Sequence, residues 1–486
     1  MNHKADKFAE KTIQQLNFYG GQYCNKGKVE EALDFFRTSA KLQFCYNQWY
    51  CDDYIEKQLK KIALKINIHY THEKDEKTVL FYDGFGHDTR GLAYIYLEAL
   101  SKSDYDIIYI TCQDNCQNQP NIMRLLKDER HKVYHVSNIG KLEKIEKIIE
   151  IFKQEKFSIA FFYTTPWDVS AVVAFNELAG KCIRYQINLT DHAFWLGKNT
   201  FDYCLEFRPY GAAVSKTYRK INPNQLIYMP YYPVIQNNAT FKGFPFSTQG
   251  KKIVFSGGSL TKTIDEKKTY YRLVENVIEK HKDVIFLYAG DGPKREMLHL
   301  ISKYPHRVYL IQERDDLLQI LKRARIYLNT FPISGGLMLQ YAAMADCVPV
   351  TLRREWDEDA CGILKNEKAL KEIFTEYQQA CKEIDRLLDD DKYWMDKRRA
   401  LKGQVITEQQ FNKRLSDILK NPIQNIMREA LKVDTRQFLQ TYKENITLED
   451  VAIWTFDREC NINIMCKKFP HIAIIRLYYK LLHMGK

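Results

Sequence analysis

Few residues of this 486-residue chain are of the types that mark disordered, fibrous or disulfide-stapled proteins. Glycine and proline together account for 34 residues, and the 12 cysteines are scattered. Such usage excludes collagen-like, low-complexity and disulfide-scaffold proteins. No apolar run approaches the roughly 18 residues that span a bilayer, and the opening MNHKADKFAEKTIQQL lacks the apolar core of a signal peptide. We therefore expect a soluble, cytoplasmic protein with reduced thiols.

The chain also lacks any block of charge of one sign. Its 73 basic and 61 acidic residues give a formal net charge of +12, with lysines spread along the whole length. The excess indicates an anionic partner, which can be nucleic acid, lipid headgroups or a phosphate-bearing substrate. No zinc-finger, RRM or helix-turn-helix pattern occurs, so we predict no nucleic-acid partner.

The spacing of apolar residues predicts two α/β domains and helical ends. Residues 1–75 have helical spacing and are expected to form a cap. From 76 to 234, short strands such as TVLFYD and FSIAFFY alternate with amphipathic helices, as in a parallel sheet. Residues 235–250 have no period and indicate a linker, and a second alternating series fills 251–365. The remainder, 366–486, is predicted to be a helical extension.

The predicted fold class is therefore α/β, with two tandem Rossmann-like domains. Ligands of such folds bind at the carboxyl ends of the strands, so we expect the site in a cleft between the two sheets. The turns that follow the strands are the places to look for functional residues.

The first such turn is DGFGHDTRG, which follows the strand TVLFY. Gly86 lets a ligand approach the backbone, and His87, Asp88 and Arg90 supply polar groups. The turn is not a GxGxxG fingerprint, so nicotinamide binding is not expected. A purely structural role for His87 is an equal alternative.

The second turn is INLTDHAFWLG, again just after a strand. Asp191 and His192 are adjacent in it, and a histidine beside a carboxylate can act as a general base or bind a sugar hydroxyl. A packed loop is the alternative. Trp195, flanked by His192 and Gly197, is the aromatic residue that we expect to stack on a carbohydrate.

Two turns in the second domain have the composition of a phosphate site. SGGSLTK supplies Gly257, Gly258 and Lys262, a combination of backbone donors and a point charge that suits a diphosphate. Gly335 and Gly336 open a helix, whose first amides can hold a phosphate.

The run LNTFP, then Gly-Gly, an alanine-rich helix and VPVTL resembles the "LDTFP…GG…EAL..G.PVVTL" segment of GT-B glycosyltransferases. The resemblance is strongest to the O-linked N-acetylglucosamine transferases and the bacterial protein N-glucosyltransferases. FSGGSLTK, RYQINLTDHAFWLGKNTFDYCL and DGFGHDTRGLAYIYLEAL are similar to further segments of that family in the same order. The similarity covers about residues 78–355. Two departures stand out, because Asn329 replaces an Asp and Ala342 stands where a ribose-contacting carboxylate is usual.

The resemblance implies a transferase that uses a nucleotide-sugar donor, UDP-linked by expectation, with no cofactor and no metal. Lys262 and the amides of Gly335 and Gly336 would stabilise the leaving diphosphate, and Gln340 would replace the missing ribose contact. A protein or glycan acceptor would bind near Gly86, Arg90 and Trp195. The expected catalytic residues, which would remove the acceptor's proton, are as follows: His192, His87, Asp88 and Asp191.

Two other functions remain open. A nucleotide-sugar 2-epimerase uses the same double fold, although it needs several carboxylates at the site, which the sequence does not reveal. A non-catalytic subunit that binds a glycan or a partner transferase is also compatible, chiefly because of Ala342. The sequence does not distinguish retention from inversion, and it does not identify the sugar.

The final stretch, FPHIAIIRLYYKLLHMGK, is basic and amphipathic. It has two interpretations, a helix docked on the body of the protein or a helix lying at an anionic membrane surface on the inner face of the membrane. Docking is the commoner fate of such helices.

Overall fold

The computed structural model describes residues 3–66, 71–89, 91–234, 239–354, 362–365, 370, 372–427 and 432–484. It contains two parallel sheets, which confirms the predicted α/β fold with two Rossmann-like halves. By contacts the chain divides into two compact units. Unit 1 contains residues 1–229 and 412–486, and unit 2 contains residues 230–411. This division into two units does not test the bounds of the five predicted segments, which stay a prediction.

The sheet of unit 1 has seven strands in the order β3-β2-β1-β4-β5-β6-β7. The strands are β1 (Thr78–Asp83), β2 (Asp106–Thr111), β3 (Lys132–His135), β4 (Ile159–Tyr163), β5 (Ile183–Asn188), β6 (Tyr203–Glu206) and β7 (Leu226–Tyr228). Every residue of β1 and β4 is buried. Helices cover both faces of a parallel sheet, so its central strands are apolar throughout rather than alternating.

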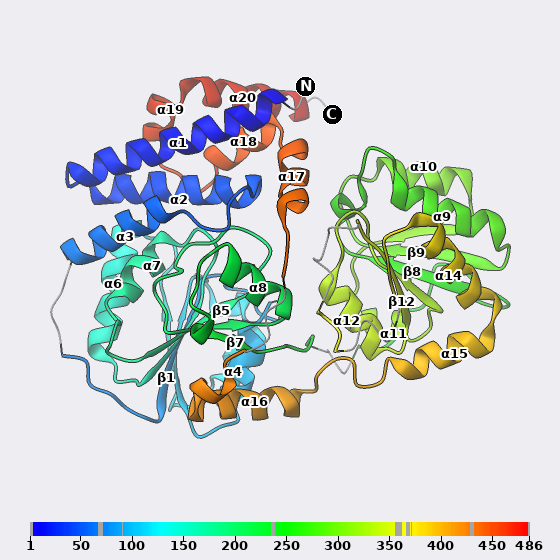
Figure 1. The fold of residues 1–486 in the computed structure, drawn as a ribbon, viewed down its shortest axis with the longest axis horizontal. Helices are drawn as coiled ribbons and strands as arrows, with labels where there is room; N and C mark the ends of the chain where they lie inside the picture. The colour runs from blue at the N-terminus through cyan, green and yellow to red at the C-terminus, as the bar shows by residue number, and fades with distance from the viewer. Residues whose placement is uncertain are drawn as a thin grey trace. The chain divides into compact units, whose positions relative to one another are not determined.

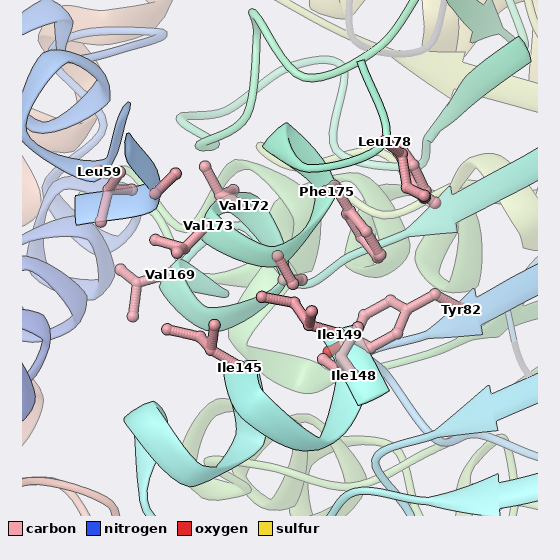
Figure 2. Close-up of a cluster of buried hydrophobic side chains, with 14 of the residues drawn as sticks. Leu59, Tyr82, Ile145, Ile148, Ile149, Val169, Val172, Val173, Phe175 and Leu178 are labelled. Carbon is pink, nitrogen blue, oxygen red and sulfur yellow. The ribbon is translucent and has the colours of Figure 1, made fainter. Parts of the chain in front are cut away.

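Helices of unit 1 follow the strands or form a cap. The connecting helices are α4 (Ala93–Ser101), α5 (Pro120–Leu125), α6 (Lys141–Gln154), α7 (Val169–Asn176) and α8 (Pro209–Thr217). In α6, residues Ile145, Ile148, Ile149 and Phe152 are buried at helical spacing. Figure 2 shows several of them packed with side chains of α7 and with Tyr82.

The cap of unit 1 is built from both ends of the chain (Figure 1). Its N-terminal helices are α1 (His3–Asn25), α2 (Val29–Tyr46) and α3 (Asp53–Ile66). Its C-terminal helices are α17 (Arg436–Asn445), α18 (Leu448–Thr455), α19 (Ile462–Lys468) and α20 (Pro470–Met484). One apolar cluster joins the two groups, and it includes Leu16, Phe35, Val451, Met465 and Phe469.

The sheet of unit 2 has six strands in the order β10-β9-β8-β11-β12-β13. The strands are β8 (Lys252–Gly257), β9 (Val284–Ala289), β10 (Val308–Ile311), β11 (Ile326–Leu328), β12 (Val348–Leu352) and β13 (Ile373–Phe374). The helices are α9 (Thr269–Lys280), α10 (Arg295–Lys303), α11 (Leu317–Leu321), α12 (Gly336–Met344), α14 (Tyr377–Asp389) and α15 (Asp391–Ala400). Helix α16 (Glu408–Lys420) then carries the chain back into unit 1.

Most of the segment expected to be a linker belongs to unit 2. Phe241, Phe244 and Phe246 pack on one another and on Tyr309 of β10, with the rings of Phe244 and Phe246 stacked 5.1 Å apart. The lack of periodicity in this segment reflects irregular backbone that is nonetheless packed.

Candidate functional site

Each sheet has a topological switch point, where the strand order reverses. In unit 2 it lies between β8 and β11, and in unit 1 between β1 and β4. The loops that leave the carboxyl ends of these strands flank a crevice, which is the usual ligand site of doubly wound folds. The predicted donor residues lie in the unit 2 loops, and most of the other predicted residues lie in unit 1 loops.

The loop after β8 depends on glycine for its path. Gly258 has a φ of +122°, and its amide donates to the carbonyl of Ala289, 2.9 Å away. A side chain on Gly290 would overlap the carbonyl oxygen of Gly258. The close packing of the two strand-end loops therefore requires glycine at position 290, whereas position 258 favours glycine because of its positive φ.

Lys262 follows in the short 3-10 helix η3 (Leu260–Thr263). Its carbonyl accepts a hydrogen bond from the amide of Ile333, 3.3 Å away, which joins the loop after β8 to the loop after β11. Its side chain is half-buried and forms no ion pair within the part of the chain that the structure describes. The ammonium group is therefore placed at the switch point without a protein carboxylate to neutralise it.

Asn329 organises the loop after β11. It is buried, and its Oδ1 accepts hydrogen bonds of 2.9 Å from the amides of Thr330 and Gly335. Its Nδ2 donates to the hydroxyl of Thr351 at 3.2 Å. Asn329 thus holds the loop through both atoms of its amide, a role that needs no carboxylate.

This arrangement changes the predicted phosphate donors. The amide of Gly335 is already used by Asn329, so it is not available to a ligand in this conformation. Gly336 is the first residue of α12, where amides have no partner within the helix. The free donors that the described loop offers are therefore the amides of Gly336 and of the next two residues, Leu337 and Met338.

Gln340 and Ala342 lie deeper along α12. Ala342 is fully buried in the apolar cluster beneath the helix, so a longer residue at this position would face the core rather than a ligand. The absence of a carboxylate there is therefore no evidence against nucleotide binding. Gln340 Nε2 donates to the carbonyl of Tyr231 at 3.1 Å, while its buried Oε1 has no partner among the described residues.

In unit 1, the turn after β1 is folded around Asp83. This buried carboxylate accepts hydrogen bonds from the amides of Phe85 and Gly86, both at 3.0 Å, and from the Tyr109 hydroxyl at 2.7 Å. Burial raises the pKa of Asp83 to about 6, against the lowering effect of these donors. Gly86, with a φ of +64°, therefore forms part of a tight turn rather than an open approach to the backbone.

Asp88, the second predicted catalytic residue of this turn, is engaged at the start of a helix. Asp88 Oδ1 accepts from the amides of Asn121 and Ile122, at 2.9 and 3.0 Å, and so caps the start of α5. His87 is exposed, with its ring 6.1 Å from that of Phe85. Arg90 lies outside the described residues.

Asp191 and His192 do lie together, at the carboxyl end of β5. His192 Nδ1 is 3.3 Å from Asp191 Oδ1, and the histidine side chain is one-third exposed whereas the aspartate is fully buried. Asp191 also accepts from Arg208 Nε at 2.6 Å and Nη2 at 2.9 Å. Burial opposes ionisation of Asp191, but Arg208 outweighs it and holds the pKa well below the usual range. The carboxylate therefore stays charged and can orient the imidazole.

The backbone of this turn is fixed by Arg219, which is completely buried. Its Nη2 donates to the carbonyls of Thr190, Asp191 and Ala193, at 3.2, 3.1 and 2.6 Å. The guanidinium also lies 4.9 Å from the ring of Trp195, which is only 4% exposed. Trp195 therefore packs inside the protein against Arg219 and stabilises the turn. Its ring has no exposed face on which a sugar could stack, contrary to the expectation from the sequence.

A cavity of about 500 Å³ lies at the switch point of the first sheet. Gly84 and Phe85 line it from the end of β1, and Trp167 and Asp168 line it from the loop after β4. The cap contributes Arg37 of α2. The half-buried Trp167 lines this edge, although it was not among the predicted site residues. It lies in the turn TTPWD, which follows the strand FSIAFFY just as the predicted turns follow their strands.

A buried ion pair forms one wall of the cavity. Lys144 Nζ is 3.2 Å from both oxygens of Asp168, and the Tyr82 hydroxyl donates to Asp168 at 2.5 Å. Burial disfavours the charged form of Lys144, but Asp168 outweighs this and raises its pKa. Cys112 Sγ lies 3.2 Å from the Tyr82 hydroxyl. The ammonium group of Lys144 therefore stays charged in the folded protein, and its ion pair with Asp168 gives the cavity polar groups on one wall.

Comparison with known proteins finds similarity in structure only. No family model and no curated protein matches the sequence. A mutant O-GlcNAc transferase from Thermobaculum terrenum matches with a TM-score of 0.52 and 12% identity over 85% of each chain. A putative UDP-N-acetylglucosamine 2-epimerase from Listeria monocytogenes matches with a TM-score of 0.52 and 11% identity, over 73% of this chain and 99% of the other.

A third solved structure is a mutant of S. aureus TarM in complex with fondaparinux, α-GlcNAc-glycerol and UDP. It matches with a TM-score of 0.51 and 10% identity, over 71% of this chain and all of TarM. At this identity the likeness establishes the fold alone. The chain has the two-domain GT-B fold, as the sequence resemblance implied, and the fold is common to transferases and epimerases.

Proposed function

We propose that the protein is a metal-independent glycosyltransferase that moves a hexosyl or N-acetylhexosaminyl group from a UDP-linked donor to a protein or glycan acceptor. The observation that carries this proposal is that the loop of Lys262 is joined to the loop that leads into α12 at the switch point of unit 2. The hydrogen bond from Ile333 to the Lys262 carbonyl joins the two loops. Transfer releases a nucleoside diphosphate, whose growing negative charge an unpaired ammonium group and free helix amides stabilise.

The cavity of unit 1 is proposed to hold a part of the acceptor beyond the reacting group, since His192 is not among the residues that line it. Its lining includes the aromatic rings of Phe85 and Trp167 and the charged groups of Lys144 and Asp168. An aromatic surface beside fixed hydrogen-bonding groups is a common arrangement in sites for polar small molecules. A volume of about 500 Å³ accommodates a sugar residue or a short side chain of a protein acceptor.

His192 is the proposed general base. Nδ1 lies 3.3 Å from the Asp191 carboxylate, which favours the tautomer with the proton on Nδ1 and the basic lone pair on Nε2, the form that a general base needs. Asp88, the carboxylate next to His87 in the sequence, caps α5.

The donor site is tested by replacing Lys262 with alanine and measuring the binding of UDP, GDP and dTDP by calorimetry. Loss of a charge-assisted phosphate contact should weaken binding by about 1.5–3 kcal/mol, or one to two decades in Kd. Lys267→Ala, an exposed lysine a few residues along the same loop, is the matched control and should bind as the parent does. Equal affinity in the Lys262→Ala protein would refute the donor site.

The reaction class is tested by incubating the protein with nucleotide sugars and candidate acceptors. Acceptor-dependent release of nucleotide supports transfer, interconversion of the sugar at C2 supports an epimerase, and silence supports a binding subunit. In that assay His192→Gln should lower kcat by about 100-fold with the donor Kd unchanged, whereas His87→Gln should have a small effect. Equal small effects from the two variants would exclude both as the base.

A further inference from the structure

Helix α20 is docked on the cap by only one of its faces. Ile472 is fully buried in the cluster that joins α1, α2, α18 and α19, and Phe469, just before the helix, is buried there too. The ring of His471 meets that of Phe8 edge-on at 5.8 Å. This contact accounts for the N-terminal part of α20 and for the side of the helix that faces α1 and α18.

The opposite face is apolar and open to solvent. The five large side chains on it are Ile474, Leu477, Tyr478, Leu481 and Leu482, which are 69, 58, 58, 60 and 47% exposed. Their spacing of three and four residues places them on one side of the helix. Figure 1 shows α19 and α20 on the outer side of α1, away from the sheet. A contiguous apolar face of this kind marks an interaction surface.

The charged residues of α19 and α20 have one sign. From residue 461 onward the sequence contains no Asp or Glu, whereas α19 and α20 contain Lys467, Lys468, Arg476 and Lys480. Lys468 lies over the ring of Tyr19, 4.7 Å from its centre. In the described part of the chain the other three form no ion pair.

Acidic groups of the neighbouring helices are engaged elsewhere. Asp6 and Glu10 of α1 lie near Lys443 of α17, at 3.9 and 3.4 Å. Asp450 closes the capping box at the start of α18. These three acidic groups therefore do not neutralise the basic residues of α19 and α20.

We propose that α20 binds an anionic membrane surface, with its apolar face in the interface and its basic residues among the headgroups. An exposed apolar face on a helix whose only charged residues are basic suits binding in a charged interface. A second copy of the chain fits this face less well, because a two-fold contact would oppose two helices that carry only positive charge. No described helix is long and apolar enough to cross a bilayer, so the contact is peripheral.

The test is flotation of the full-length protein with phosphatidylcholine vesicles, with and without phosphatidylglycerol. We expect binding to the anionic vesicles only, weakening as salt is added. Leu477→Ser/Leu481→Ser should lower binding at least about ten-fold, since it removes apolar burial but no charge. Lys467→Gln/Lys480→Gln should lower it about 25-fold, at about five-fold for each basic residue near anionic lipid.

Matched controls separate this surface from the general positive charge of the protein. Leu298→Ser removes an equally exposed helical leucine from unit 2, and Lys60→Gln/Lys61→Gln removes two exposed lysines from α3. Both should float with the vesicles as the parent does. Failure of the parent protein to bind anionic vesicles overturns the proposal whatever the variants do. The proposal is also overturned if the two lysine double variants lose vesicle binding equally. A parent protein that is a dimer, and that dissociates in the Leu477→Ser/Leu481→Ser variant, overturns it as well.

Discussion

Glu56 of α3 is a carboxyl group that the fold buries between the cap and the turn that carries His192. It accepts hydrogen bonds from the amides of Gly197, at 2.7 Å, and Lys198, at 3.4 Å. Burial nevertheless raises the pKa of Glu56 to about 7 from an ordinary value of 4.5. A proton on this side chain therefore favours the folded state.

The sign of the resulting pH dependence follows from linkage. Between pH 4.5 and 7 the unfolded chain releases this proton while the folded protein keeps it, so rising pH favours unfolding. The loss of stability attributable to Glu56 is about 3 kcal/mol and is complete above pH 7. In the Glu56→Gln protein, the fall in the free energy of unfolding between pH 5 and pH 8 should be smaller by about that amount. Urea unfolding at the two pH values measures it.

The control for this measurement is Glu146→Gln, which removes an exposed carboxylate from α6. It should retain the parent's pH dependence. An unchanged slope in the Glu56→Gln protein would mean that Glu56 is ionised at neutral pH despite its burial.

At the residue scale, the sequence located turns better than side-chain directions. Lys262 and His192 were predicted from their positions just after strands, and the structure places both near the carboxyl ends of the expected strands, with Lys262 half-buried and His192 one-third exposed. Trp195 was chosen by the same pattern, yet its side chain is buried. The direction of a side chain depends on groups that are far away in the sequence. Arg219, for example, packs against the ring of Trp195, and no local sequence pattern reveals this contact.

At the scale of elements, one side chain links the cap to the first sheet. Glu30 of α2 accepts hydrogen bonds from the first two amides of α6, those of Lys141 at 2.9 Å and Leu142 at 2.6 Å. A carboxylate at a helix start satisfies free donors and interacts favourably with the helix dipole. Glu30 thus caps a helix that is more than a hundred residues away in the chain.

We expect Glu30→Ala to lower the free energy of unfolding by about 1–2 kcal/mol, the usual effect of losing a helix cap. Glu31→Ala is the matched control, because Glu31 lies beside it on α2 and pairs only loosely with Lys28, at 3.9 Å. The two variants can be compared by urea unfolding. Equal stability in both would show that water replaces the Glu30 contact without loss.

The same helix shows why element-level prediction was incomplete. One apolar face of α2 is buried against the helices of the sheet through Ala32, Leu33 and Phe36. Phe35 and Leu42, on the other side, are buried against α1 and the C-terminal helices. A helix covered on two sides has no single apolar stripe, so the sequence predicted the helix but not its second partner.

At the scale of the whole molecule, the double sheet was predictable and the closing of the cap was not. Strands such as β1 and β2 have the bounds of the apolar runs TVLFYD and DIIYIT, because central parallel strands are apolar throughout. The return of residues 412–486 to unit 1 is a non-local pairing. Helical spacing shows that a helix needs an apolar partner, but it does not identify the partner.

This return of the chain sets the order in which the protein can be completed during translation. Unit 2 is a single continuous stretch, so it can fold once residue 411 has left the ribosome. Unit 1 begins first but is finished last, since Leu16 and Phe35 obtain their partners Val451 and Met465 only after the intervening unit has been made. Until then the nascent chain carries an uncovered apolar surface on its earliest helices, which is where a chaperone would bind.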